Sequence, residues 1–196
     1  MNTRTIALAS GALIAGLILA GCSSADGMSG MDHGNSPMPG NADAGSTSFN
    51  DADVAFAMNM IAHHEQAIEM ADIVLAKEDV DGSVLDLATK IKGAQAPEID
   101  TMTSWLEAWG QSTDMGGMNH GGMMSEDDMA ALEAAAGAEA SRLFLEQMTV
   151  HHQGAIDMAT DEIADGQSPD AVALAKKIVE DQTAEILTMQ QLLAAM

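Results

Sequence analysis

The chain has 196 residues, of which 47% are apolar, and a formal net charge of -23. This length allows one domain plus a tail. The charge excludes nucleic acid as a natural partner, because phosphate binding needs a basic surface. It also disfavours electrostatic binding to anionic lipid and concentrates cations, although solubility or life in salt is the favoured explanation of the charge. Met occurs 17 times and His six times, and every His lies close to Met in the sequence.

Residues 1–21 are predicted to be a lipoprotein signal peptide. Arg4 precedes an apolar run from Ile6 to Ala20, and small residues follow, which is typical of an export signal. The run is too short and too rich in glycine to predict a membrane span.

The end of this segment, Leu19-Ala20-Gly21-Cys22, resembles the bacterial lipobox. The resemblance implies that Cys22 is lipidated and becomes the mature N-terminus. Two acyl chains would then anchor the protein stably, and the lipid would be its only attachment to the membrane. We therefore expect a location at the cell membrane on the extracytoplasmic side. A plain cleaved signal with an incidental cysteine is the alternative.

Residues 22–48 are rich in Gly, Ser, Asp and Asn and lack periodic apolar positions, which predicts a flexible tether.

Residues 49–196 contain an internal duplication. The segment from Phe56 to Ala71 matches the segment from Phe144 to Ala159 at an offset of 88, with Phe, Met, His, His, Ala, Ile, Met and Ala recurring in place. A second match, Gln-x-x-Glu-Ile-x-x-Met, starts at Gln95 and again at Gln182. The repeats cover about 49–110 and 125–196, and a Met/Gly-rich loop, 111–124, joins them.

The first repeat predicts two helices. The first runs from near Asn50 to about Lys77, with Gly82 as its stop signal. The second opens with Ser83-x-x-Asp86, which resembles a capping box, and ends at Trp109-Gly110. Pro97 lies inside the second helix and should kink it.

The second repeat predicts a similar pair. Ser125-x-x-Asp128 starts a helical stretch that Gly137 divides and Gly166 ends, and Ser168-Pro169 opens the last helix. Two helical hairpins of similar length predict an all-α four-helix bundle with approximate two-fold symmetry.

One face of each repeat's first helix combines thioethers with imidazoles. At 100° per residue, Met60, His63 and Met70 form one stripe with His64 on its flank, and the second repeat preserves the pattern. Thioether sulfur selects Cu(I) or Ag(I), and imidazole accepts copper or zinc. The partner helices add a Glu and a Met each, and the Glu would either orient a histidine or bind metal directly. The predicted metal ligands of the bundle are Met60, His63, His64, Met70, Glu98, Met102, Met148, His151, His152, Met158, Glu185 and Met189.

The structural alternative is core packing. A Met stripe at helical spacing commonly fills irregular gaps in a core, and a buried His is commonly hydrogen-bonded without metal. The duplicated His-His pair with Met three residues upstream is the narrower pattern, and it favours a ligand role for at least one His of each pair.

Two segments outside the predicted helices share a Met-x-x-Met-x-His spacing and resemble the flexible copper-capturing segments of exported proteins. The alternative is a low-complexity linker, and we expect the loop residues to belong to no apolar face. The predicted auxiliary capture residues are Met28, Met31, His33, Met115, Met118, His120, Met123 and Met124.

The duplicated Met-x-x-His-His-x-x-Ala-Ile-x-Met-Ala pattern resembles the family called domain of unknown function 305, over roughly Phe49 to Met196. The resemblance implies a ferritin-like fold and copper binding at Met60, His63, His64 and Met70, with the corresponding ligands Met148, His151, His152 and Met158 in the second repeat.

These patterns favour a metal-binding lipoprotein that sequesters or passes copper, most favourably Cu(I), with silver or zinc as further ions and a copper-handling protein as a possible partner. A ferritin-like di-iron oxidase needs Glu-x-x-His pairs, and no His here has Glu three residues before it. We therefore expect no enzyme and no catalytic residue. A metal-free helical scaffold of the cell envelope is the remaining alternative, and the oligomeric state stays open.

Overall fold

The computed structural model describes residues 48–112 and 121–196, which form five α-helices and no strand. The helices are α1 (Asp51–Leu75), α2 (Gly82–Ala108), α3 (Glu126–Ala134), α4 (Gly137–Asp165) and α5 (Pro169–Ala195). The predicted signal peptide, nearly all of the tether and the middle of the Met/Gly-rich loop lie outside the described residues. None of the described helices combines the length and apolar character that a membrane span requires.

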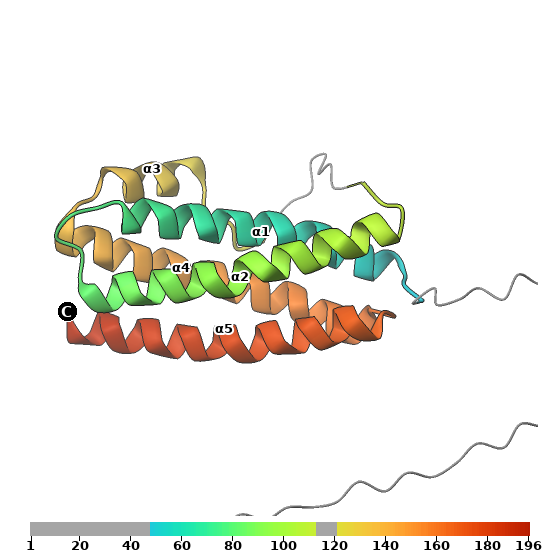
Figure 1. Cartoon of the computed structure of the whole chain (residues 1–196). Helices are drawn as coiled ribbons and strands as arrows, with labels where there is room; N and C mark the ends of the chain where they lie inside the picture. The colour runs from blue at the N-terminus through green and yellow to red at the C-terminus, as the bar shows by residue number, and fades with distance from the viewer. Residues whose placement is uncertain (1–47, 113–120) are drawn as a thin grey trace, which may run out of the picture. The chain divides into compact units, whose positions relative to one another are not determined.

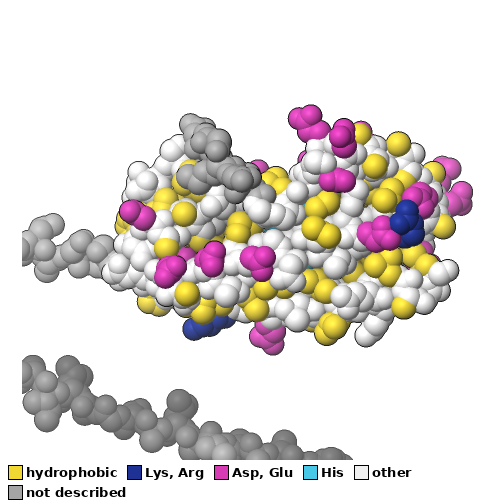
Figure 2. All heavy atoms as spheres, turned by 180° about the vertical axis from the view of Figure 1, so that it is seen from behind, with side chains coloured by type: hydrophobic (Ala, Val, Ile, Leu, Met, Phe, Trp, Pro, Cys, Tyr) yellow, Lys and Arg dark blue, Asp and Glu magenta, His cyan; other side chains and the backbone are white. Residues whose placement is uncertain are grey.

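The four long helices form the predicted bundle of two hairpins (Figure 1). α1 packs on α2 and α4 packs on α5, while α1 and α4 meet along the seam between the two repeats. The short helix α3 lies over α1 and α4. Acidic side chains are scattered over the face drawn in Figure 2, and basic side chains appear there at only a few places.

Most predicted helix ends are confirmed by their caps. The side chain of Asn50 accepts hydrogen bonds from the first turn of α1, and Ser125 forms a capping box with Asp128 at α3. Gly137, with φ of +54°, separates α3 from α4, and Ser168 caps α5 ahead of a proline at the first helical turn. α2 is a continuous helix through Pro97.

The connection between α1 and α2 differs from the prediction. Asp79 has φ of +60° and makes the turn, because a short polar side chain tolerates the left-handed region. Asp81, whose carboxylate accepts the backbone N–H of Ser83 at 2.8 Å, is the cap of α2. The predictions that Gly82 ends the first helix and that Ser83 caps the second are therefore wrong.

The apolar core consists of two clusters at opposite ends of the bundle. We name each cluster after the interhelical turn that it lies toward. The first-turn cluster lies toward the turn between α1 and α2 and includes Met70, Val74, Leu87, Ile91, Phe144, Met148 and Met189. The second-turn cluster lies toward the turn between α4 and α5 and includes Phe56, Met60, Met102, Leu106, Ala155, Ala159 and Ile178. Positions that correspond in the two repeats lie in opposite clusters. Phe56 and Met60 of the second-turn cluster correspond to Phe144 and Met148 of the first-turn cluster.

A buried carboxyl pair joins the helix ends beyond the second-turn cluster. Asp53 is fully buried and accepts backbone N–H groups from Asn50 at 2.6 Å and Ser168 at 2.8 Å. Burial opposes its ionisation, but these hydrogen bonds outweigh burial and lower the pKa of Asp53. Burial, and then the neighbouring Asp53, raise the pKa of Glu162 to about 8. The folded chain therefore holds a proton on Glu162 at neutral pH.

We expect Glu162→Gln to flatten part of the pH dependence of stability. Because the folded pKa of about 8 exceeds the ordinary value of 4.5, the contribution of Glu162 to stability is fully present below pH 4.5 and is lost as the pH rises toward 8. The free energy of unfolding of the variant, from urea denaturation, should rise relative to the unmodified protein between pH 5 and 8. The exposed Asp161→Asn is the control. Parallel pH profiles for Glu162→Gln and the unmodified protein would contradict the assignment.

Candidate metal centre

Between the two apolar clusters, each long helix buries polar side chains. Along α1, His63 and His64 lie between the residues of the second-turn cluster and those of the first-turn cluster. Along α4, His151 and His152 occupy the same place between the two clusters. Gln95 on α2 and Gln182 on α5 occupy the corresponding positions between the clusters. We call these six side chains the polar layer: His63, His64, Gln95, His151, His152 and Gln182. All four imidazoles are 0% exposed, so the layer crosses the interior of the bundle.

His63 and His151 bring the two repeats into contact at the centre of this layer. Their ring centroids are 3.7 Å apart, with an interplanar angle of 38°. Burial, followed by the neighbouring His63, His152 and His64, lowers the pKa of His151 well below its ordinary value. The two adjacent rings are therefore not both protonated, and a neutral imidazole keeps a lone pair for a metal ion.

The other histidine of each pair contacts the glutamate of its own repeat. His64 Nε2 lies 2.9 Å from Glu98 Oε2, and His152 Nε2 lies 2.7 Å from Glu185 Oε2. Burial, which outweighs the contact with Glu98, lowers the pKa of His64. A neutral ring with its proton on Nε2 donates to the carboxylate and leaves the Nδ1 lone pair available. Of the two predicted roles for the glutamates, the geometry favours orientation of a histidine.

Several polar atoms of the layer are buried without a hydrogen-bond partner among the described residues. They are Nδ1 of His64 and of His152, both side-chain amide atoms of Gln95, and Oε1 of Gln182. An unpartnered buried polar group costs about 1–3 kcal/mol. An ion held by the two histidine nitrogens and the two glutamine oxygens would remove much of that cost, so these donors fit a metal ion.

Four predicted thioether ligands flank the layer. Met60 and Met102 lie in the second-turn cluster, Met148 and Met189 lie in the first-turn cluster, and all four are fully buried. Within the described residues, no three His, Cys, Asp or Glu side chains come together as a metal-binding group. The thioethers of these four residues are the soft donors on either side of the imidazoles.

Met70 and Met158, which the duplication relates, have different surroundings. Met70 is fully buried in the first-turn cluster, beside Ala67 and Val74. Met158 is partly exposed and lines two surface cavities, one of them together with Asp157 and Asp161. Their equivalence as ligands therefore stays a prediction from the sequence, and the packing of Met70 is that of a core residue.

The predicted capture residues fall largely outside the described residues. Met28, Met31, His33, Met115, Met118 and His120 lie there, as does Cys22. Of the two others, Met123 is partly buried, and Met124 packs against the first-turn cluster. The expectation that the loop residues belong to no apolar face is therefore wrong for Met124, because the end of the loop lies on the bundle.

Gln95 and Gln182 are the members of the layer that were not predicted as site residues. Both begin the repeated Gln-x-x-Glu-Ile-x-x-Met motif, and both are 3% exposed. Glu98 and Glu185 lie one helical turn further along on the same face. Recurrence of a polar residue at the same place in both repeats was the available signal.

The family model for a domain of unknown function, DUF305, matches residues 53–193. The chain belongs to the DUF305 family. No protein with a curated description matches it.

Solved DUF305 structures share the fold. A protein from Streptomyces coelicolor, described as secreted, is 34% identical, with a TM-score of 0.70 over 74% of this chain and 93% of its own. A DUF305 fragment from Deinococcus radiodurans is 31% identical, with a TM-score of 0.70 over 75% of this chain and 98% of its own.

A third similar structure, CopM in a Cu(II)-bound form, is 32% identical, with a TM-score of 0.64 over 73% of this chain and 96% of its own. CopM has also been solved in Cu(I)-bound and Ag-bound forms. DUF305 proteins thus include one that binds copper and silver.

We expect Glu98→Leu and Glu185→Leu to destabilise the fold by similar amounts. Each change leaves the Nε2–H of a fully buried imidazole without its acceptor, which costs about 1–3 kcal/mol. The free energy of unfolding from urea denaturation measures the loss. Glu180→Leu, on an exposed position of α5, is the control and should change stability by less than about 0.5 kcal/mol. Losses no larger than that of the control would show that the glutamates do not hold the histidines.

Proposed function

We propose that this chain is an exported, non-catalytic copper-binding lipoprotein that holds Cu(I) within the polar layer for sequestration or transfer outside the membrane. The observation that carries the proposal is the layer itself, in which four fully buried imidazoles from two repeats lie between two pairs of fully buried thioethers. Copper- and silver-bound forms of CopM support the choice of ion.

The chemistry of the donors favours a soft monovalent ion. Thioether sulfur prefers Cu(I) and Ag(I), and neutral imidazole accepts either. His64 and His152 would present Nδ1 to the ion, because their Nε2 atoms face Glu98 and Glu185. Met60, His63, Met148 and His151 lie on α1 and α4, the two helices that meet at the seam between the repeats. Zinc would use the imidazoles but gains little from thioethers.

The proposal of a non-catalytic role follows from the same residues. A ferritin-like di-iron site uses Glu-x-x-His motifs that project carboxylates inward, whereas this chain has Met three residues before His63 and His151. The carboxylates that reach the layer, Glu98 and Glu185, contact histidine nitrogens. A bound ion would therefore be held among soft donors and buried from substrates.

We expect the layer, and not the flexible methionines, to be the principal Cu(I) site. In the full chain, the auxiliary Met residues are changed to Leu and the auxiliary His residues to Gln, which preserves the packing of Met124. This background should bind Cu(I) under reducing conditions with Zn(II) present at equal concentration. Bound Cu(I) should stabilise the fold by about 2.7 kcal/mol when its free concentration is 100 times the Kd.

The decisive variant adds Met60→Leu, His63→Gln, Met148→Leu and His151→Gln to that background. These changes nearly conserve volume, so the helices should form, whereas Cu(I) affinity should fall by at least about 100-fold. The matched control adds Met58→Leu and Met129→Leu, which alter partly buried methionines outside the layer. If the background variant binds no Cu(I), the replaced Met and His residues of the tether and loop are the principal ligands. Preference for Zn(II) would favour a His/Glu zinc site.

Attachment to the membrane rests on Cys22, which lies outside the described residues. We expect Cys22→Ser to move the protein from the membrane fraction to the soluble exported fraction, because two acyl chains would be the whole of its attachment. Detergent partitioning of cell fractions measures this. Cys22→Ser protein that still partitions into detergent like the unmodified protein would contradict the lipobox interpretation.

A further inference from the structure

The segment Gly121–Met124, which we call the strap, is fixed to α1 by a single side chain. Gln66 Nε2 donates to the carbonyl of Met124 at 3.0 Å, and the backbone N–H of Met124 donates to Gln66 Oε1 at 2.7 Å. Both ends of one amide are thus used on one residue's backbone. The strap is therefore held in a defined position on α1.

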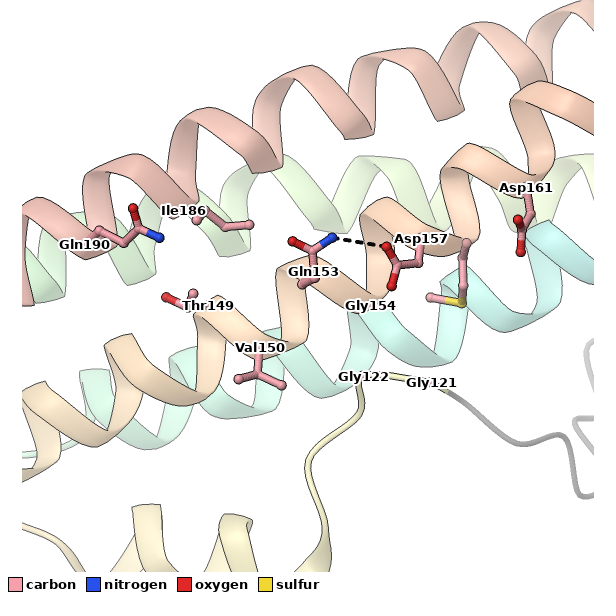
Figure 3. A pocket seen from close by; sticks show the side chains of 11 residues that line it. Gly121, Gly122, Thr149, Val150, Gln153, Gly154, Asp157, Asp161, Ile186 and Gln190 are labelled. Carbon is pink, nitrogen blue, oxygen red and sulfur yellow. Dashed lines mark hydrogen bonds between the residues drawn. The ribbon is translucent and has the colours of Figure 1, made fainter.

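On its other side the strap lies directly on the backbone of α4 (Figure 3). A Cβ at Gly154 would lie 2.6 Å from the carbonyl oxygen of Gly121 and from the Cα of Gly122, and a Cβ at Gly122 would lie 2.5 Å from the Cα of Gly154. Gly122 also has φ of +83°, which favours glycine independently. Contact this close requires glycine on both sides.

The two anchoring positions correspond in the duplication. Gln66 and Gly154 are 88 residues apart, as His63 and His151 are, and each follows its histidine by three residues. The strap therefore crosses the α1–α4 seam within one helical turn of the contacting imidazoles of His63 and His151. A Cβ at Gly122 would lie 3.5 Å from His63 Nε2, so the backbone of the strap lies next to this ring.

A cavity of about 630 Å³ opens beside the strap. Gly122 and Gly154 form part of its wall, and Met158, Asp157 and Asp161 also line it. Carboxylates and a thioether at this opening would attract and hand on a soft cation. Gly122 thus borders both this cavity and the ring of His63.

We propose that the strap, positioned by Gln66 and Gly154, closes the His63/His151 pair on the side of this cavity and controls the exchange of solutes with it. The role in ion exchange rests on the proposed function, whereas the closure of the histidines does not. Opening the strap would expose His63 to the cavity, and Cu(I) would then enter or leave past Met158.

Chemical modification of the metal-free full chain tests the closure. Diethyl pyrocarbonate reacts with accessible imidazole, and mass spectrometry of peptides gives the rate at each histidine. Gly154→Ala, which drives a Cβ into the strap, and Gln66→Ala, which removes its two hydrogen bonds, should each raise the modification rate of His63 and His151 by about tenfold. Gln153→Ala is the control, because Gln153 is exposed, lines the same cavity and donates a hydrogen bond to Asp157 on its own helix.

Release of Cu(I) to the chelator bathocuproine disulfonate tests the effect on ions. Both strap variants should release Cu(I) about tenfold faster than the unmodified protein, and Gln153→Ala should not. If all folded variants have equal modification rates, the closure is overturned, whether or not the protein binds metal. Faster modification with unchanged release of bound Cu(I) would overturn the role in ion exchange. Absence of Cu(I) binding in the unmodified protein would instead refute the proposed function and leave the modification rates to decide the closure. If Gly154→Ala fails to fold, Gln66→Ala alone decides both points.

Discussion

Each long helix of this bundle buries at least one polar side chain at the middle of the core. The rest of the site depends on how these buried polar groups find partners. An apolar layer would have been sufficient for four helices of this length. The chain instead divides its core into two clusters and places four fully buried imidazoles and two amides between them. Unsatisfied polar atoms in such a position reduce stability. Glu98 and Glu185 satisfy part of the layer, and the remaining nitrogen and oxygen atoms are where an ion would add most to stability.

The duplication explains why the layer lies at mid-length and why it joins the repeats. Two-fold symmetry places equivalent positions opposite one another at the seam, so a single histidine in the repeat unit becomes the contacting pair of His63 and His151. Changes between the repeats then give the two sides of the seam different properties. Gln66 binds the strap by hydrogen bonds where Gly154 admits it by the lack of a side chain. Met158 is open to solvent where Met70 is enclosed.

Helical periodicity, capping residues and the internal repeat were enough to predict the bundle and most helix ends, because those signals are local. Asn50, Gly137 and Ser168 behave as their residue types suggest. The turn at Asp79 was not predictable, since several polar residues compete for it. The places of Gln95 and Met124 depend on how the helices and the loop are positioned against one another, which no local pattern encodes. Whether Glu98 orients a histidine or binds metal also depends on how the helices are positioned, and no local pattern encodes it.

The charge of the chain and the neutral donors of its interior support the proposal of a monovalent ion. A net charge of -23 attracts cations of any kind to the surface, so selection has to occur inside. Burial lowers the pKa of His64 and His151, and thioethers carry no charge, so most of the donors around the layer are neutral. A divalent ion there would bury a larger uncompensated charge than Cu(I), at a desolvation cost that rises steeply with charge. Glu98 and Glu185 contact the layer through His64 and His152 rather than facing its centre as a group of ligands, so the donors left for the ion itself are neutral.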